Sequence, residues 1–183
     1  MNKFIEPTTI VSGRSFALSR IQAFIKNPII FFQKCKDDRI ILIPVATMFI
    51  RIEALVGMIV AFVQSGEVSK QVMKEFLTLV LAKPLAYLLL IVGGAVIDMV
   101  VKLVARKANI HAAERVAAYS YIANIIGSIP VVGIISLPLI VILRAIGIAK
   151  QYKLGYVSAT IAAAIPTALI FGALWFIKTS LKG

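Results

Sequence analysis

Two ionisable residues interrupt the first long apolar stretch of this 183-residue chain. Arg51 and Glu53 lie inside residues 40–63, a segment otherwise apolar enough to cross a bilayer. A charged side chain inside the hydrocarbon layer costs roughly 2.5–3.5 kcal/mol on insertion scales, so it needs a partner, water or a lipid headgroup. At ~1.5 Å per residue, Arg51 falls about 16 Å into the layer, near its midplane. Because Glu53 is rotated by about 200° from Arg51 on a helix, the two side chains cannot share one face.

Further polar residues in apolar stretches extend this candidate set: Asp98, Tyr119, Ser120 and Arg144. Asp98 and Arg144 lie about 6 Å and 9 Å from the inner ends of their predicted spans, so a bridge between them is geometrically reasonable. Asp98 also precedes Lys102 by four residues, which is the favourable order for an ion pair on one helix.

Two interpretations of this set remain open. In the functional interpretation, the side chains line a polar pathway or a binding cavity. In the structural interpretation, Asp98 and Arg144 join two helices and Arg51 extends to the membrane surface. We favour the structural interpretation for Asp98 and Arg144, which lie close to water. We favour the functional one for Arg51 and Glu53, because their depth makes an idle charge costly.

The sequence gives little support to enzymatic chemistry. Its single His (His111) and single Cys (Cys35) exclude a Cys/His metal cluster and an intrachain disulfide. It contains no Gly-rich phosphate loop and no HExxH motif, and only 8 Asp and Glu residues. We therefore expect a protein without enzymatic activity, metal or cofactor.

The composition predicts the elements that position these residues. Hydrophobic residues make up 60% of the chain and charged residues only 15%, against roughly 25% charged in typical soluble proteins. We expect an all-α fold, a polytopic membrane helical bundle of about five transmembrane helices preceded by an amphipathic interfacial helix. The predicted organisation is a cytoplasmic segment at residues 1–39 and a transmembrane domain at 40–183, with spans at about 40–63, 84–104, 113–129, 131–149 and 156–177.

The number of spans depends on how the apolar run at residues 76–105 is divided. Pro84 suits the first turn of a helix, so Lys83-Pro84 is the expected division. Residues 69–82 then form a shorter helix at the outer interface. Without this division, the count becomes four or six.

Loop charges predict the orientation in the membrane. With the N-terminus inside, thirteen of the 20 Lys and Arg residues fall on the cytoplasmic side and four on the opposite side. Lys and Arg are enriched in cytoplasmic loops, so we expect a multi-pass cell-membrane protein with a cytoplasmic N-terminus and its C-terminus outside. Two aromatic pairs flank the last span, as interfacial aromatic residues do: Tyr152 and Tyr156 at its inner end, and Trp175 and Phe176 at its outer end.

The N-terminal segment carries apolar residues at helical spacing among basic ones, and Asn27-Pro28 predicts a helix start. Such a segment either lies in the headgroup layer or docks over the inner ends of the spans. Cys35 is an acylation candidate there, with an idle thiol as the simpler interpretation. The residues expected at the lipid interface are Phe31, Phe32, Lys34, Lys36, Arg106, Lys107, Lys150 and Lys153.

Several short motifs resemble those of the Yip1-domain proteins. The order Asn27-Pro28-Ile29-Ile30-Phe31-Phe32 is similar to the entry motif of that family. Ala118-Tyr119-Ser120 and Arg144-Ala145-Ile146-Gly147-Ile148 resemble two later motifs, so the resemblance covers residues 27–175. It implies a five-span membrane fold with a cytosolic N-terminus and, as in eukaryotic members, a role in membrane traffic and membrane shaping. The short N-terminal region looks more like the prokaryotic branch.

Two classes of function follow. The first is a non-enzymatic membrane organiser or trafficking-type adaptor of the Yip1-like kind, which binds lipids and membrane proteins, including further copies of itself. The second is a small ion or solute transporter or channel that uses the intramembrane charges. A formal net charge of +12 favours anionic lipid headgroups at the cytoplasmic face as partners. Nucleic acid is not expected, because aromatic residues are not interleaved with the basic ones at base-stacking spacing.

Overall fold

The computed structural model describes residues 13–37, 39–65, 70–129 and 135–180, with the side chains of 13–16, 65 and 169–180 left out. Helices account for nearly all of these residues, and none of them lies in a strand. The predicted all-α class is therefore confirmed for the described part of the chain. The predictions for residues 1–12 of the cytoplasmic segment and for the first residues of the span at 131–149 concern positions outside the described part.

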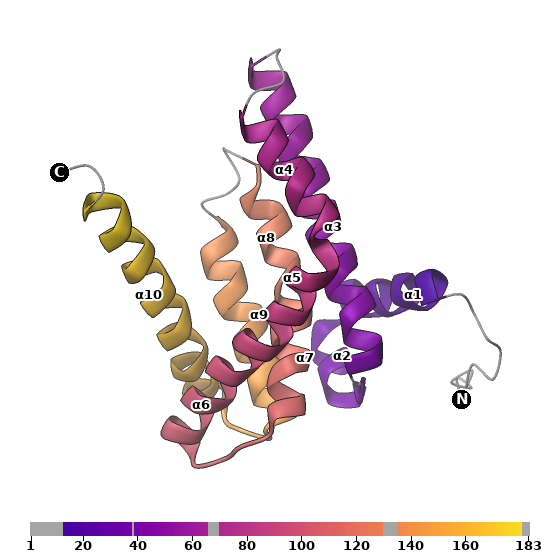
Figure 1. The fold of residues 1–183 in the computed structure, drawn as a ribbon. Coiled ribbons are helices and arrows are strands. Elements are labelled where there is room, and N and C mark those ends of the chain that lie inside the picture. Colours follow the sequence, from indigo (N-terminus) through magenta and orange to yellow (C-terminus); the bar gives the residue numbers. More distant parts are fainter. Residues whose placement is uncertain (1–12, 38, 66–69, 130–134, 181–183) are drawn as a thin grey trace.

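The helices form an upright bundle, from which α1 (Gly13–Lys26) extends sideways at a steep angle (Figure 1). Five segments run side by side and alternate in direction: α3, the run α5–η1–α6, the pair α7–α8, α9 and α10. The elements in chain order are α1 (Gly13–Lys26), α2 (Pro28–Lys34), α3 (Arg39–Ser65), α4 (Lys70–Val80), α5 (Ala82–Leu88), η1 (Leu89–Gly93), α6 (Gly94–Ala105), α7 (Ile110–Ser120), α8 (Ile122–Gly127), α9 (Ser136–Gln151) and α10 (Tyr156–Ser180).

Two stretches are long and apolar enough to cross a membrane, Arg39–Gln64 and Ala82–Ala105. They contain the predicted spans at 40–63 and 84–104. A third apolar stretch, Tyr156–Ala168, is shorter. Helix length and composition therefore give weak support to membrane association, and the expected number of five spans is not confirmed.

The remaining predicted spans are divided or shortened. Residues predicted as one span at 113–129 form α7 and α8, which are separated at Tyr121. In the predicted span at 131–149, the described helix begins only at Ser136, and 130–134 lie outside the described residues. The helix α10 begins at Tyr156, where the last span was predicted to start.

Pro84 lies in the first turn of α5, as its missing amide hydrogen predicts. The preceding helix α4 does not lie apart from the bundle, because it runs antiparallel along α3 (Figure 1). A Cβ on Gly57 of α3 would lie 3.1 Å from Cδ of Glu75, so the two helices approach closely at this point. Between α5 and α6, the five residues Leu89–Gly93 form a π-helical turn.

The predicted helix start at Asn27 is confirmed. The Asn27 side chain accepts a hydrogen bond of 3.0 Å from the amide of Ile30, and Pro28 occupies the first helical position. The helix pair α1–α2 docks on the bundle through an aromatic cluster of Phe24, Phe31, Phe32 and Tyr119, whose ring centroids lie 4.5–6.2 Å apart. The docking interpretation of this segment thus has direct structural support.

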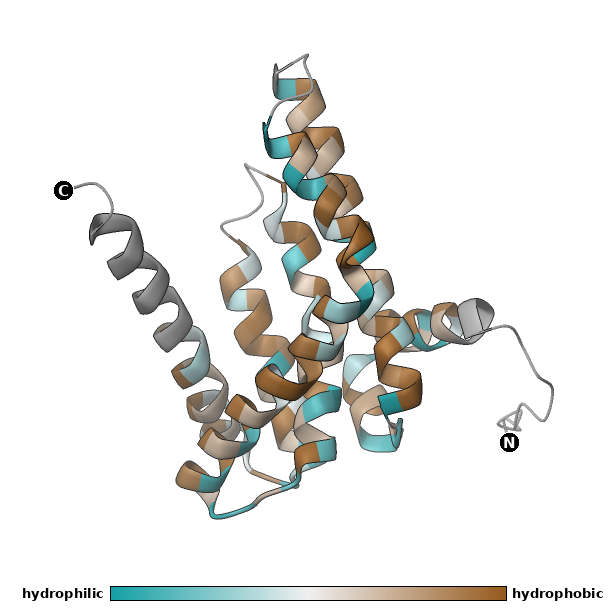
Figure 2. Ribbon diagram, viewed as in Figure 1, coloured by the Kyte–Doolittle hydropathy of each residue, from teal (hydrophilic) through white to brown (hydrophobic). Residues whose placement is uncertain are grey.

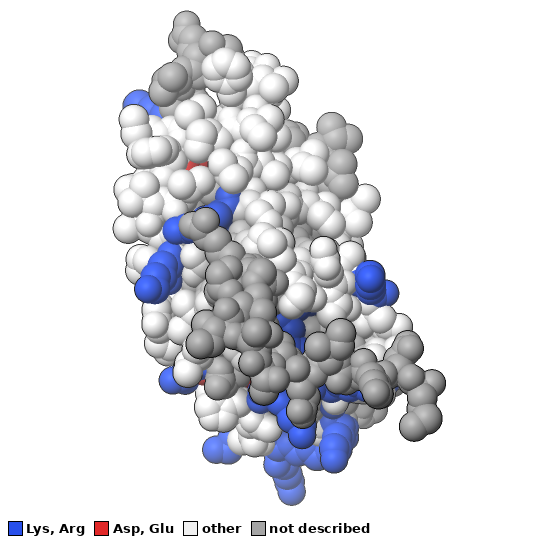
Figure 3. All heavy atoms as spheres, turned by 90° about the vertical axis from the view of Figure 1, so that its right-hand side faces the viewer, with Lys and Arg blue, Asp and Glu red and all other residues white. Residues whose placement is uncertain are grey.

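Apolar and basic residues occupy different parts of the surface. Hydrophobic residues run along most of α3, α5, α6 and α9 (Figure 2), and many large ones are exposed there, among them Ile59, Leu88 and Leu103. A surface this apolar favours contact with lipid or with another apolar surface. Lys and Arg side chains gather at the end of the bundle where α6 meets α7 (Figure 3), which we call the basic end.

Candidate functional site

A buried carboxylate holds the N-terminal helices against the bundle. Asp37, in the link between α2 and α3, is only 2% exposed. Its Oδ1 lies 3.0 Å from the Arg20 guanidinium of α1, and its Oδ2 accepts a 2.6 Å hydrogen bond from the Tyr119 hydroxyl of α7. Arg115 of α7 donates to the Asp37 carbonyl at 2.7 Å and to Gln151 of α9 at 2.9 Å. These five side chains, the Asp37 cluster, connect α1, α7, α9 and the α2–α3 link.

A second buried carboxylate, Glu114 of α7, fixes the beginning of α3. Its side chain is 0% exposed and accepts a 2.6 Å hydrogen bond from Nε of Arg39. His111 Nδ1 lies 3.4 Å from the other carboxylate oxygen. A Cβ on Gly94 would lie 2.9 Å from Cγ of Glu114, so α6 can pass this close only where a side chain is missing.

Asp98 belongs to a group of hydrogen bonds at the basic end. Its Oδ1 accepts from the Asn109 amide at 2.6 Å and from the Tyr152 hydroxyl at 2.7 Å. Asn109 also caps α7 by accepting from the amide of Ala112 at 3.1 Å. Burial raises the pKa of Tyr152, and the nearby Asp98 carboxylate raises it further, so the phenol remains a donor.

The expected bridge between Asp98 and Arg144 does not form. Arg144 instead donates to Thr167 of α10 at 3.1 Å, and its Nε is buried without a hydrogen-bond partner. The Asp98 carboxylate instead accepts hydrogen bonds from the Asn109 amide and the Tyr152 hydroxyl. The expected pair of Asp98 with Lys102 is likewise absent from the ion pairs of the described residues.

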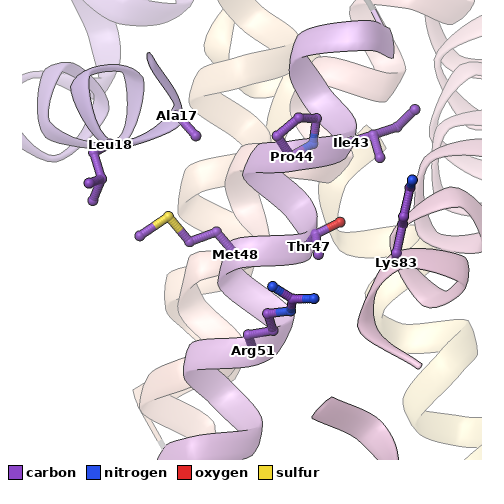
Figure 4. Close-up of a pocket in the computed structure, with 8 residues that line it drawn as sticks. All are labelled: Ala17, Leu18, Ile43, Pro44, Thr47, Met48, Arg51 and Lys83. Carbon is purple, nitrogen blue, oxygen red and sulfur yellow. The ribbon is translucent and has the colours of Figure 1, made fainter. Parts of the chain in front are cut away.

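Arg51 and Glu53 lie on different sides of α3, as their rotation predicts. Glu53 accepts a short hydrogen bond from the Tyr121 hydroxyl, at the point where α7 gives way to α8. Arg51 lines a cavity of about 430 Å³ that also touches α1 and α5. The cavity is lined by Ala17, Leu18, Ile43, Pro44, Thr47, Met48, Arg51 and Lys83 (Figure 4).

The predicted pathway residues are therefore dispersed. Tyr119 bonds to Asp37, and the buried Ser120 donates to the carbonyl of its own helix neighbour Ala117 at 3.3 Å. No two of the six predicted residues share a hydrogen bond or an ion pair within the part of the chain that the structure describes.

The prediction that Phe31 and Phe32 lie at the lipid interface is wrong. Their side chains are 6% and 0% exposed, because both pack in the aromatic cluster. Cys35 is also buried rather than at an interface. Burial, with Asp37 nearby, raises the pKa of its thiol to about 12, so the group is a poor nucleophile for acylation.

The predicted basic interface residues have mixed surroundings. Lys34, Lys36 and Arg106 are exposed, as expected. Lys107, however, binds the carbonyls of Tyr152 and Lys153 at 3.0 and 3.1 Å and so ties two loops together. Lys150 lies over an aromatic ring, with its Nζ 5.2 Å from the ring centre of Tyr156. Lys153 and Arg106 both adopt left-handed backbone angles.

Sequence reasoning missed Asp37, Glu114 and Gln151. It predicted Tyr152 at the membrane interface, which is wrong, because this side chain is only 5% exposed and its hydroxyl donates to Asp98. The sequence did contain one signal for the carboxylates. Acidic residues are few and basic residues many, so each carboxylate outside the apolar runs could be expected to pair with a cation. Within the described ranges, no group of three or more His, Cys, Asp or Glu residues could hold a metal ion.

Comparison with known proteins identifies no relative: no protein-family model, curated protein or solved structure matches the chain. The Yip1-like resemblance therefore stays a prediction from the motifs.

Proposed function

We propose that this chain is a five-span membrane protein with a cytoplasmic N-terminus and its C-terminus on the other side. The alternating directions of α3, α5–α6, α7–α8, α9 and α10 support this topology (Figure 1). The gathering of cations at the basic end supports the orientation, since Lys and Arg favour cytoplasmic loops.

In this membrane we propose a non-enzymatic organiser or adaptor that binds lipids and membrane proteins. The observation that carries the proposal is the docked helix pair α1–α2. The Asp37 cluster holds this pair against the bundle. Four large apolar side chains on the pair nevertheless remain exposed: Leu18, Ile25, Ile29 and Ile30. A rigidly held helix with exposed apolar residues and flanking cations inserts shallowly into one leaflet, which favours curvature or clustering of membranes. Membrane shaping is also what the Yip1-like resemblance implies.

The transporter alternative has less support. A pathway needs polar groups that face a common space, whereas the predicted ones bind separate partners. Glu53 in particular is occupied by the Tyr121 hydroxyl.

Reconstitution into liposomes tests the proposal. We expect clustering or deformation of vesicles by electron microscopy, without ion or proton flux. Replacing exposed apolar residues of the helix pair (Ile25→Ser with Ile29→Ser) should abolish the effect. The matched control Leu88→Ser with Leu103→Ser changes two large apolar residues elsewhere that are also exposed, and it should preserve the effect. Vesicles that keep their shape but show a flux abolished by Glu53→Gln would favour the transporter instead.

A further inference from the structure

The cavity beside Arg51 combines apolar walls with two cations. α1 contributes Ala17 and Leu18 to the walls, and α3 contributes Ile43 and Met48. Arg51 of α3 and Lys83 of α5 bring positive charge to the same space. The cavity opens outward from the bundle, because Leu18, Arg51 and Lys83 are all exposed. It is therefore suited to an amphipathic anion rather than to a small inorganic ion.

The two cations have no carboxylate partner within the described ranges. Thr47, which lies between them, has a buried hydroxyl without a hydrogen-bond partner. In Figure 4 this hydroxyl points toward the side of α3 on which Lys83 lies. Charges at the edge of an apolar surface need a partner, water or a lipid headgroup, and an anionic headgroup would satisfy both cations at once.

An apolar stripe leads away from Arg51 along α3. Leu55, Ile59 and Phe62 follow on the same helix face and are 48%, 64% and 59% exposed. From Arg51 to Phe62 the helix rises about 16 Å at ~1.5 Å per residue, a length comparable to that of an extended acyl chain.

We propose that this cavity binds one anionic phospholipid, with its phosphate at Arg51 and Lys83 and an acyl chain along Leu55, Ile59 and Phe62. The inference rests on the proposed membrane location.

Lipid binding to the full-length protein in a neutral detergent tests the site. Native mass spectrometry would compare phosphatidylglycerol with phosphatidylcholine of the same acyl chains. We expect a preference for phosphatidylglycerol that falls at least about tenfold in the variant Arg51→Gln with Lys83→Gln, because each lost charge-assisted hydrogen bond corresponds to roughly a tenfold change. The control Lys70→Gln with Lys74→Gln removes the same charge from exposed positions on α4, outside the cavity, and should keep the preference.

Three outcomes would overturn the site: an unchanged preference in the Arg51/Lys83 variant, an equal loss in the control, or displacement of the lipid by millimolar inorganic phosphate. The last would indicate a free anion as the ligand. Circular dichroism of both variants checks that the helices are intact. Because binding is measured without vesicles, failure here with normal vesicle clustering would refute only the site, whereas specific binding without clustering would refute only the organiser role.

Discussion

Removing the Asp37 carboxylate should release the N-terminal helices while leaving the rest of the bundle folded. The variant Asp37→Ala deprives the Tyr119 hydroxyl of its acceptor, and a buried polar group left unpaired costs ~1–3 kcal/mol. It also removes the partner of Arg20, which is 36% exposed, so this pair adds at most ~1 kcal/mol. The local opening of α1–α2 should therefore become easier by about 1–4 kcal/mol.

Hydrogen exchange of the protein in detergent or nanodiscs measures this directly. Exchange through local opening follows the opening equilibrium, so amides of Gly13–Lys26 and Pro28–Lys34 should exchange about fivefold to several hundred-fold faster. The control Asp98→Ala removes a carboxylate that also accepts two hydrogen bonds, but at the basic end, and should leave these amides unchanged. Equal acceleration in both variants, or none in Asp37→Ala, would refute the assignment of Asp37 as the residue that holds α1–α2 in place.

Two further predictions concern packing and the buried thiol. Gly94→Ala places a Cβ 2.9 Å from Cγ of Glu114 and should lower the free energy of unfolding by ~1–3 kcal/mol. The control Gly155→Ala adds a Cβ with no atom within 4 Å and should leave this free energy unchanged. Thermal unfolding of the two variants measures the difference. The folded Cys35 thiol keeps its proton up to about pH 12, while the unfolded one loses it near 9.0, so Cys35 should lower stability as pH rises from 9 to 12. Denaturant titrations of wild type and Cys35→Ala check this, and parallel pH profiles would contradict it.

Local signals in the sequence were enough to predict several helix boundaries. The Asn27 cap, the proline at the first turn of α5 and the start of α10 depend on residues within one helical turn, and all three are found. The length of the later helices was harder to predict, since no proline, glycine or charged residue lies beside the division at Tyr121.

The surroundings of Phe31 and Phe32 could not be predicted in the same way. A lipid tail and a protein core are both apolar, so a pair of aromatic residues fits either one equally well. The polar contacts were missed for a different reason: Tyr119 is 82 residues from Asp37, and Arg39 is 75 residues from Glu114. Only the packed arrangement of α1, α3 and α7 brings these residues together.

The π-helical turn at Leu89–Gly93 relates the two halves of the second long apolar stretch. An α-helix advances by about 100° per residue, so one additional residue within a turn rotates everything beyond it by that angle. Lys83 lies before this turn and Asp98 after it, and each faces a different neighbour. Deleting a single residue from Leu89–Gly93 could restore regular α-helical winding, yet Lys83 and Asp98 could then no longer both reach their present surroundings. The length of this turn thus sets the rotation of Asp98 relative to Lys83 about the helix axis, so that each side chain faces its own neighbour.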